Sequence, residues 1–592
     1  MLFSTNESKR YEQAREILAV CRETNSERTS RYRSLRHIYS YGAHTGLECK
    51  DNRIKPIIDQ LSSFIYTPET CNFWADIGPR AAAGWAEVPP QVLDALSSVT
   101  TIAQISDEKL EQLVEQINFD RIDSVTDSIN DSWHDTDIDT LLGTSVTNAL
   151  VDGSSVIMLN AERLHGADRN LIVAYDLPPE EFGVFDPGEP ILARQQAVMH
   201  LAGITKPELL RKIAGHPYRT KILNSLEVMT PMGVASSRIF PTSATSTSVT
   251  GAPLGVFTGR YDYEPRGGAP RYVVAQLHCW DDRAGDWRVF VFSADNVLWE
   301  TLQGGVFSSE GKLIKRGMGI KGRLPYVKIC PYPLRRYVFG YSLVDGLTPL
   351  QNWYSQRLNQ LDIMFAKALS PPKAVLGMGG LDDEIKNALD TEGGVAFLGQ
   401  PGAQIQEMAT QVPPEALTIL NNIQEMFYEF SSMRATLFGR QEKGTRTEGM
   451  LAGLLRVSAA ATRKTALVVE RDIEAVAQLL YLYKREFEDD ELSAPDGNNF
   501  FLHEFPQDAR IRVDGHSSSA LFVQDNMAMA ESLGRLGLAV PSKQIMLMNP
   551  PLKAALIHDL KKVEMARMVA AQVIKQQQNA KRSGKAQQAQ AA

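Results

Sequence analysis

The feature that most constrains this chain is a series of three helical patterns between Tyr341 and Glu488. In each pattern apolar residues recur at steps of three and four, which predicts a helix with one apolar face. The predicted helices cover residues 348–369, 413–438 and 447–488. The third contains no proline, and at its full length it would extend for about 60 Å. The rest of the 592-residue chain is expected to be organised around these helices.

A capping residue and several prolines mark the ends of the first helix. Thr348 is a suitable N-cap, and Pro349 would occupy the first helical position, where its missing N–H has no cost. The pair Pro371-Pro372 ends the pattern, because proline and the residue before it disfavour a helix interior. The sequence therefore predicts a helix from Thr348 to Leu369.

The insert between the first two helices, residues 371–412, is too short to hold much of a core. Its pattern predicts a short helix at 381–389 and short strands at 394–398 and 405–408. Such an insert would gain stability by packing against the same insert of neighbouring copies. The alternative is a surface hairpin that has no partner.

A polar loop separates the second and third helices and carries three cations, Arg440, Lys443 and Arg446. Two glycines in this loop have the spacing of a phosphate-binding loop, but Thr445 stands where that motif needs lysine. Nucleotide hydrolysis is therefore not indicated. Cations on such a loop can hold phosphates without reading bases. The alternative is an ordinary solvated loop between two helices.

Elsewhere the chain predicts helices and strands in separate blocks. From about residue 254 to 330 the apolar period becomes two, which predicts an antiparallel meander. Because strands and helices are segregated rather than alternating, the predicted class is α+β, mainly helical. Thr205 is the expected N-cap of one short helix. The predicted helices are 6–25, 52–64 with a break at Pro56, 106–133, 137–151, 205–213, 518–536 and 553–578, and the strands are 71–77, 154–160, 171–176, 255–263, 271–281, 287–293, 297–302, 326–329 and two within 498–513.

Composition and motifs argue against several classes of function. The formal net charge of −8 argues against general electrostatic capture of nucleic acid. The five cysteines are scattered and form no CxxC pair, which fits reduced thiols. There is no zinc-binding motif and no GxSxG nucleophile elbow, so we expect no metal, no cofactor, no catalytic residues and no enzyme. No apolar run approaches the ~20 residues that span a bilayer, so no membrane partner is expected.

The order of these pieces resembles the portal protein, or head-to-tail connector, of tailed bacteriophages. The resemblance covers nearly the whole chain, and its specificity lies in the order of the segments rather than in any single motif. The segments that carry it are TLLGTSVTNALVDGSSVIMLN at 140–160, YDLPPEEFGVF at 175–185, HLAGITKPELL at 200–210, the end of the meander with GRLPYVKICPYPLRRYVFGYSLVDGLTPLQNWYSQRLNQL at 322–361, and LFGRQEKGTRTEGMLAGLL at 437–455.

The resemblance implies a portal fold of wing, stem, clip and crown regions that assembles into a dodecameric ring with a central channel. Compared with the longest members of the family, this chain lacks an extended C-terminal barrel helix. The implied regions are a wing at 1–340, a first stem helix at 341–370, a clip at 371–412, a second stem helix at 413–437, a tunnel loop at 438–447, a long wing helix with return strands at 448–520, and crown helices with a basic flexible tail at 521–592.

The resemblance also implies a function and partners. The ring would sit at one vertex of the virion capsid, after assembly in the host cytoplasm, and viral double-stranded DNA would be packaged and later ejected through it. Its partners would be the terminase large subunit, the tail adaptor protein, and the major capsid and scaffolding proteins. The alternatives are another phage ring, adaptor or scaffold protein and, with less support, a phage enzyme.

The family also suggests which residues act at each place. The tunnel loop that contacts DNA would present Arg440, Lys443 and Arg446. The clip, which docks the motor and then the adaptor, would present charged residues of its short helix, namely Asp382, Asp383, Glu384 and Lys386.

Overall fold

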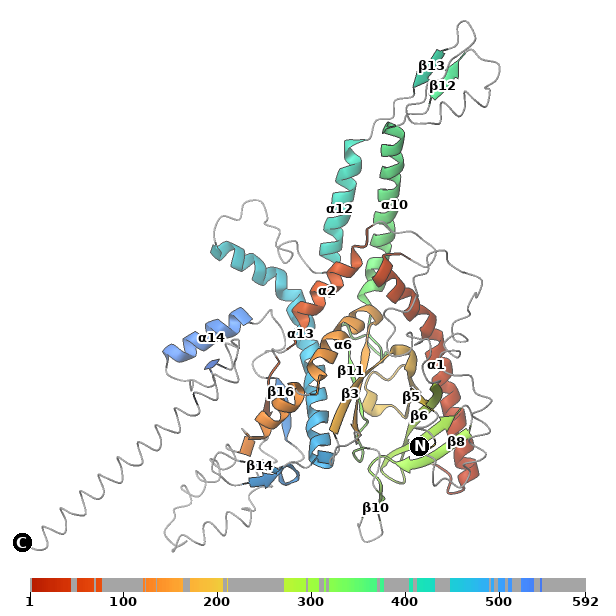
Figure 1. Cartoon of the computed structure of the whole chain (residues 1–592), viewed down its shortest axis with the longest axis vertical. Helices are drawn as coiled ribbons and strands as arrows, with labels where there is room; N and C mark the ends of the chain where they lie inside the picture. The colour runs from red at the N-terminus through yellow and green to blue at the C-terminus, as the bar shows by residue number, and fades with distance from the viewer. Residues whose placement is uncertain are drawn as a thin grey trace, which may run out of the picture.

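The structure analysed is a computed structural model of the whole chain (Figure 1). It describes residues 3–43, 51–68, 71–76, 121–122, 124–134, 136–162, 171–205, 210, 271–293, 296–307, 313–315, 319–369, 373–376, 404–407, 413–431, 448–488, 491–493, 499–505, 509–513, 523–536, 544–545 and 560.

The described chain mixes helices and antiparallel strands, and helix predominates, so the expected α+β class is compatible with the structure. The helices are α1 (Glu7–Tyr41), α2 (Ile54–Ile65), α6 (Ile138–Asp152), α10 (Leu343–Leu369), α12 (Pro414–Phe430), α13 (Glu448–Tyr483) and α14 (Val523–Arg535). The strands are β1 (Phe73–Asp76), β2 (Ser155–Glu162), β3 (Leu171–Leu177), β4 (Phe182–Val184), β5 (Ala197–Thr205), β6 (Arg271–Asp281), β7 (Asp286–Ser293), β8 (Asn296–Leu302), β9 (Val306–Phe307), β10 (Leu313–Lys315), β11 (Tyr326–Ile329), β12 (Lys373–Leu376), β13 (Gln404–Glu407), β14 (Glu491–Ser493), β15 (Asn499–Phe501) and β16 (Arg510–Val513).

The largest sheet has five antiparallel strands in the order β4-β5-β6-β7-β8. Helix α1 lies along this sheet (Figure 1), and its Leu18 and Cys21 belong to one buried cluster with Phe290 and Phe292 of β7. The meander predicted between 271 and 302 is confirmed for β6, β7 and β8. The expected strand at 255–263 lies outside the described residues.

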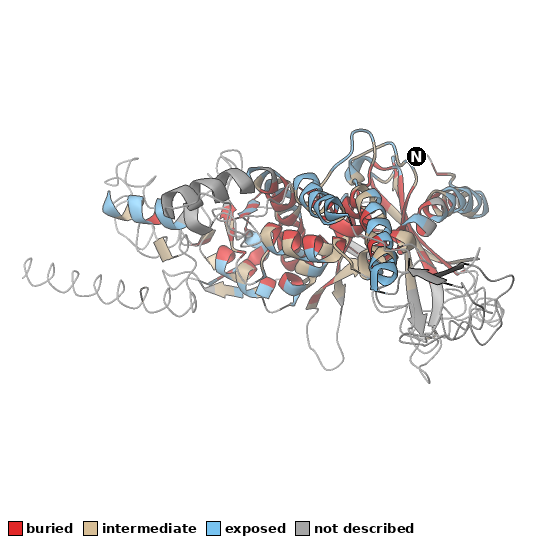
Figure 2. Cartoon of the chain, turned by 90° about the horizontal axis from the view of Figure 1, so that it is seen from above, coloured by how far each residue is buried: buried red, intermediate tan, exposed pale blue. Residues whose placement is uncertain are grey.

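A second sheet, in the order β11-β2-β3, belongs to the main core. Helices α2, α6 and α13 pack around it, and each contributes a side chain with no exposed surface to the cluster: Ile58, Leu142 and Ile473, beside Ile157 of β2. Seen from above, the buried residues gather in the interior of this region while exposed residues follow the outer sides of the helices (Figure 2). Helix α13 is therefore a central element of the core rather than a surface helix.

A buried ion-pair group holds α1 against the rest of the core. Arg36 Nη2 lies 2.9 Å from Asp152 Oδ2 at the end of α6, and Arg36 Nη1 lies 3.1 Å from Glu180 Oε1. Burial raises the pKa of Asp152 to about 7, although Arg36 opposes that shift. Since an unpaired buried charge would be strongly destabilising, this group fixes α1 in register with α6.

A second buried carboxylate joins α13 to β11. Asp472 Oδ2 accepts a hydrogen bond from the backbone N–H of Cys330, at 2.8 Å, directly after β11 ends. Burial raises the pKa of Asp472 from its ordinary value of 3.8 to about 7, while the Cys330 N–H and the Lys328 charge act to lower it. This contact anchors the middle of α13 at the edge of the second sheet.

We expect the stability of the protein to depend on the ionisation of Asp472. Because its folded pKa is higher than its unfolded pKa, its stabilising contribution is complete below pH 3.8 and is lost as the pH rises through 7. Asp472→Asn keeps an oxygen acceptor for Cys330 but cannot ionise. The free energy of unfolding of wild type relative to this variant should fall by at most about 1.4 kcal/mol per pH unit between pH 4 and 7. Urea denaturation of wild type and variant at pH 4, 5.5 and 7 measures this slope. The same difference in the free energy of unfolding at all three pH values would contradict the prediction.

The predictions for α1, α2 and the segment at Thr205 were wrong. Helix α1 continues to Tyr41, well beyond the expected end at 25, because its later turns still bury Tyr32, Leu35 and Ile38. Pro56 lies in the first turn of α2, where the missing N–H is tolerated, so it does not interrupt that helix. Thr205 is not a helix N-cap but the last residue of β5, paired with Arg271 of β6.

Candidate functional site

The most distinctive part of the molecule is a hairpin of two helices, α10 and α12, that projects from the remainder, which we call the body (Figure 1). Its far end carries the short antiparallel pair β12 and β13. Helix α10 begins inside the body: the Ser342 hydroxyl accepts from the Asp345 N–H at 3.2 Å and donates to the Val151 carbonyl oxygen. Leu343 and Val344 are buried in the main core.

The expected start of this helix was therefore placed too late. Thr348 is an interior residue of α10 whose hydroxyl donates to the carbonyl oxygen of Val344 at 2.7 Å, and Pro349 lies inside the helix. Ser342 supplies the first-turn acceptor instead. The predicted end is confirmed, because α10 stops at Leu369, before the two prolines. Helix α12 begins at Pro414, as expected, and is described as far as Phe430.

An apolar seam holds the two helices of the hairpin together. It consists of Tyr354 and Leu361 from α10 and of Leu420, Ile423 and Phe427 from α12, all buried. The Tyr354 and Phe427 rings meet edge to face with their centroids 6.4 Å apart. The seam buries one side of each helix, and the remaining sides face away from it.

A group of polar side chains, which we call the base clasp, fixes α10 where it leaves the body. The Gln351 amide is fully buried: its Nε2 donates to the Asp51 carbonyl oxygen at 2.8 Å and its Oε1 accepts from the Arg53 N–H at 3.0 Å. The Tyr354 hydroxyl donates to Asp51 Oδ2 at 2.9 Å and accepts from Arg53 Nη2 at 3.1 Å. Gln424 Nε2 of α12 lies 3.3 Å from the same hydroxyl. The base clasp therefore joins the body, α10 and α12 through groups that would be costly to bury unpaired.

One side of the hairpin, which we call the apolar flank, exposes large apolar residues. Ile419, Met426 and Phe430 are 41%, 42% and 52% exposed, and their spacing of seven and four places them on one stripe of α12. Phe430 lies over Gly346 of α10, and Trp353, 37% exposed, follows Gly346 by seven residues on the same stripe. The two stripes therefore lie on the same side of the seam. The apolar flank comprises Tyr341, Trp353, Ile419, Met426 and Phe430.

The other side of the hairpin, the polar flank, has a different chemistry. Asp362 of α10 and Asn421 and Glu425 of α12 are exposed there. Their helical positions place them across the seam from the apolar flank. This side is not purely polar, because Leu417, 52% exposed, precedes Asn421 by four residues, and Leu369, 85% exposed, follows Asp362 by seven. A two-helix element that stands away from its own core and exposes large apolar side chains has the character of a surface that contacts another macromolecule.

Gly346 permits the close approach of the two helices at the base of the apolar flank. A Cβ atom at this position would lie 2.8 Å from Cε1 of Phe430 and would also meet the Tyr341 hydroxyl. Both atoms are the ends of partly exposed side chains, so alanine at this position would have to displace the Phe430 ring and the Tyr341 hydroxyl from where they lie on α10. Glycine leaves room for them, at a place where helix propensity alone would favour alanine.

We expect Gly346→Ala to destabilise the hairpin. Overpacking costs about 1–3 kcal/mol, which should outweigh the roughly 1 kcal/mol gained in helix propensity. Urea denaturation measures the loss. In the double variant Gly346→Ala/Phe430→Ala the clash is removed, so its loss should be smaller than the two single losses added together. Strictly additive losses would show that Phe430 does not press on Gly346.

The residues that the sequence singled out for contacts with DNA and with the motor are not part of the described structure. Arg440, Lys443 and Arg446 of the polar loop lie outside the described residues, as do Asp382, Asp383, Glu384 and Lys386 of the insert. Of the two strands expected in the insert, the one at 405–408 is confirmed as β13. It pairs with β12, a strand the sequence pattern did not indicate. The strand expected at 394–398 lies outside the described residues.

Sequence reasoning placed Tyr354 on the apolar stripe but missed the base clasp and the role of Gly346. A signal for the clasp was present: Gln351 interrupts the apolar stripe one turn before Tyr354, and a buried amide needs partners. The identity of those partners depends on the 51–53 segment, about 300 residues earlier in the chain, and no local pattern reveals it.

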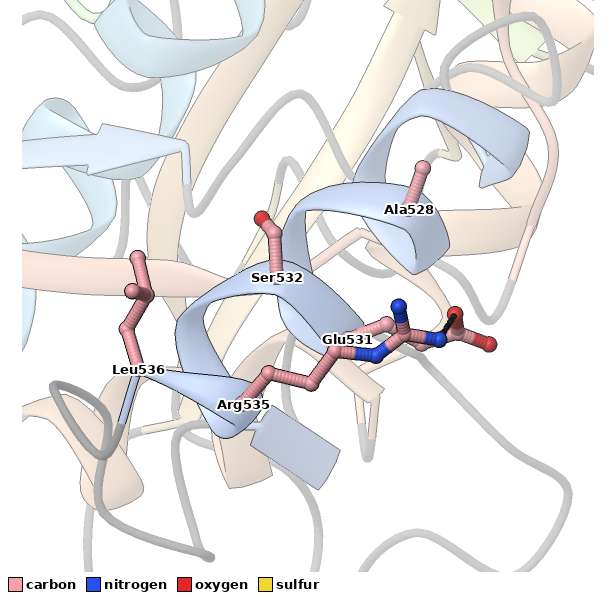
Figure 3. Close-up of a pocket in the computed structure, with 5 residues that line it drawn as sticks. All are labelled: Ala528, Glu531, Ser532, Arg535 and Leu536. Atoms are coloured by element: carbon pink, nitrogen blue, oxygen red, sulfur yellow. Dashed lines mark ion pairs between the residues drawn. The ribbon is translucent and has the colours of Figure 1, made fainter.

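Two further observations concern possible sites elsewhere in the described residues. Within the described ranges, no group of three or more His, Cys, Asp or Glu residues is arranged to hold a metal ion. A shallow hollow on α14 is lined by Ala528, Glu531, Ser532, Arg535 and Leu536 (Figure 3). Its two charged groups pair with each other at 3.6 Å and are largely exposed, so the hollow holds neither a buried charge nor an activated nucleophile.

No protein-family model matches the chain, and no curated protein matches its sequence. Among the helices of the described residues, none is both long enough and apolar enough to cross a membrane.

Proposed function

We propose that this chain is the subunit of a phage portal ring, the assembly at one capsid vertex through which double-stranded DNA is packaged and later ejected. In this proposal the hairpin is the stem, and β12 and β13 belong to the clip that docks the terminase motor and then the tail adaptor. Helix α13 is the long wing helix, and major capsid and scaffolding proteins surround the ring. The reading rests on the resemblance in segment order together with the geometry of the hairpin.

The observation that carries the proposal is the apolar flank on a projecting element. Exposed apolar side chains that gather on one side of a hairpin favour burial against another protein surface. The occupant we propose is another copy of this chain. A hairpin attached to the body at one end leaves the length of both helices available to neighbours, as a ring of parallel stems requires.

The charge of the chain suits a conduit for DNA. The whole protein carries a formal charge of −8. Like charge on a channel wall keeps DNA from adhering, so the duplex can slide. The cations of the polar loop, Arg440, Lys443 and Arg446, would then be the place where phosphates are held.

Wild-type protein at micromolar concentration should form rings. Native mass spectrometry should give about 790 kDa for twelve subunits of 65.6 kDa, and single-particle images should show a wide head, a narrow stalk and a central hole. A ring of thirteen would agree with the proposal. A mass of one or two subunits would overturn it.

A matched pair of variants tests whether the apolar flank takes part in assembly. Met426→Glu places a charge on the apolar flank and should reduce the fraction of protein in rings, because that charge would have to be buried at the contact. The control, Val20→Glu, adds the same charge at an exposed apolar residue of α1 in the body and should assemble as wild type does. If both variants assemble equally well, the apolar flank is not buried in the ring.

The three loop cations should act after assembly rather than in it. Replacing Arg440, Lys443 and Arg446 together with alanine should leave ring formation intact, but should reduce the genome length protected from nuclease in filled capsids. The loss should change with salt, since phosphate contacts are salt-dependent. The control removes three exposed cations from the body instead: Lys9→Ala, Arg283→Ala and Lys321→Ala. Equal DNA protection in the two variants would identify the loop as a simple connection.

A further inference from the structure

The charges of the hairpin are divided unequally between its two helices. Helix α12 exposes three carboxylates, Glu415, Glu425 and Glu429, and no cation. Over the part of α10 that extends beyond the base clasp, the exposed cations are Arg357 and Lys367. Outside the seam, α12 therefore presents only negative charge, whereas this part of α10 presents these two positive charges and the carboxylate of Asp362.

The antiparallel packing places these charges at matching heights. Tyr354 lies beside Phe427. Because the two helices are antiparallel, a residue a given number of positions after Tyr354 is level with the residue the same number of positions before Phe427. By this register Leu361 is level with Leu420, and both belong to the seam. The same register, within one residue, sets Lys367 level with Glu415.

The second pair of opposite charges follows the same rule. Arg357 is level with Glu425, again within one residue, at the end of the hairpin nearer the body. In the described structure neither pair forms an ion pair within the subunit: Arg357 contacts Gln360 at 2.8 Å instead. Four exposed charges thus stand at two shared levels without meeting inside one chain.

We propose that the hairpins associate side by side in the ring, with α12 of one copy beside α10 of the next, so that Glu415 faces the neighbour's Lys367 and Glu425 faces the neighbour's Arg357. This inference rests on the proposed function and names the surface through which its subunits recognise one another. Rotation about a ring axis parallel to the hairpin preserves height, so residues that are level in one subunit remain level between neighbours.

Symmetry favours head-to-tail packing of copies of this chain over two-fold symmetric packing. A two-fold axis parallel to the hairpin would set α12 against α12, or α10 against α10, and so bring like charges together. A two-fold axis perpendicular to the hairpin would invert the heights and separate the pairs. Only head-to-tail packing places unlike surfaces together at the same levels. DNA is a poor alternative occupant for the acidic side of α12, because phosphates would be repelled.

The ion pairs would select orientation and register rather than supply most of the affinity. Exposed pairs contribute little individually and are screened by salt, whereas like charges placed opposite each other oppose association. The apolar flank adds area that does not depend on salt. The surface therefore combines a salt-sensitive recognition element with a salt-insensitive one.

Two charge-reversal variants test the proposal. In the first, Glu415→Lys/Glu425→Lys makes α12 basic. In the second, Arg357→Glu/Lys367→Glu makes that part of α10 acidic. Each variant alone would place like charges at every contact, so its self-association at low salt should weaken by about tenfold or more. The control, Glu12→Lys/Glu16→Lys, makes the same charge change on exposed residues of α1 and should assemble as wild type does.

The decisive measurement is an equimolar mixture of the two variants. Around a ring in which they alternate, a basic α12 meets an acidic α10 at one contact, and the wild-type pair of helices meets at the next, so every contact is attractive. Native mass spectrometry with one variant isotopically labelled should show rings restored, with the two variants in equal number. Single variants that assemble as readily as wild type would overturn this interface and leave the portal proposal standing. Failure of the mixture to restore rings would also overturn it. Wild type without rings would overturn both proposals.

Discussion

A pair of helices can bury only the sides that face each other, and this limit governs the hairpin. The seam of Tyr354, Leu361, Leu420, Ile423 and Phe427 uses one side of each helix. Whatever apolar surface remains must be solvated or covered by another molecule. The body has no such limit, because α2, α6 and α13 surround a sheet and bury it. The apolar side chains that remain exposed along the hairpin are the reason for proposing that assembly involves this element.

The sequence predicted the helices and strands best where the period of apolar residues was long and clear. Helix α13 and strands β6 to β8 follow such patterns and are found close to their expected positions. Helix ends were less predictable. Thr348 has the chemistry of a cap, but α10 begins five residues earlier because Leu343 and Val344 are buried in the body. Tertiary packing decides such boundaries, and a local pattern does not contain it.

The sequence predicted the stripes of apolar residues on the two helices, but it did not predict how the helices pack against each other. The division of the hairpin into two flanks depends on which residues are buried in the seam. Those residues are known only once the packing of α10 against α12 is known. The close approach at Gly346 involves Phe430, which is distant in sequence. Strand β5 was also missed, because Thr205 and the residues after it suggested a capped helix, whereas pairing with β6 extends the strand to Thr205. The segment order carried the family resemblance, but it did not indicate which surfaces would meet.

The position of the base clasp makes the hairpin a lever. From Tyr354 to Leu369 the helix extends about 22 Å beyond the clasp, and its main partner over that length is α12. A rotation of about 3° at the clasp would move the far end by roughly 1 Å, about the displacement that separates a good hydrogen bond from a broken one. Small rearrangements of Asp51 or Arg53 would therefore be amplified at the tip. A load applied at the tip would be delivered back to the same few polar groups.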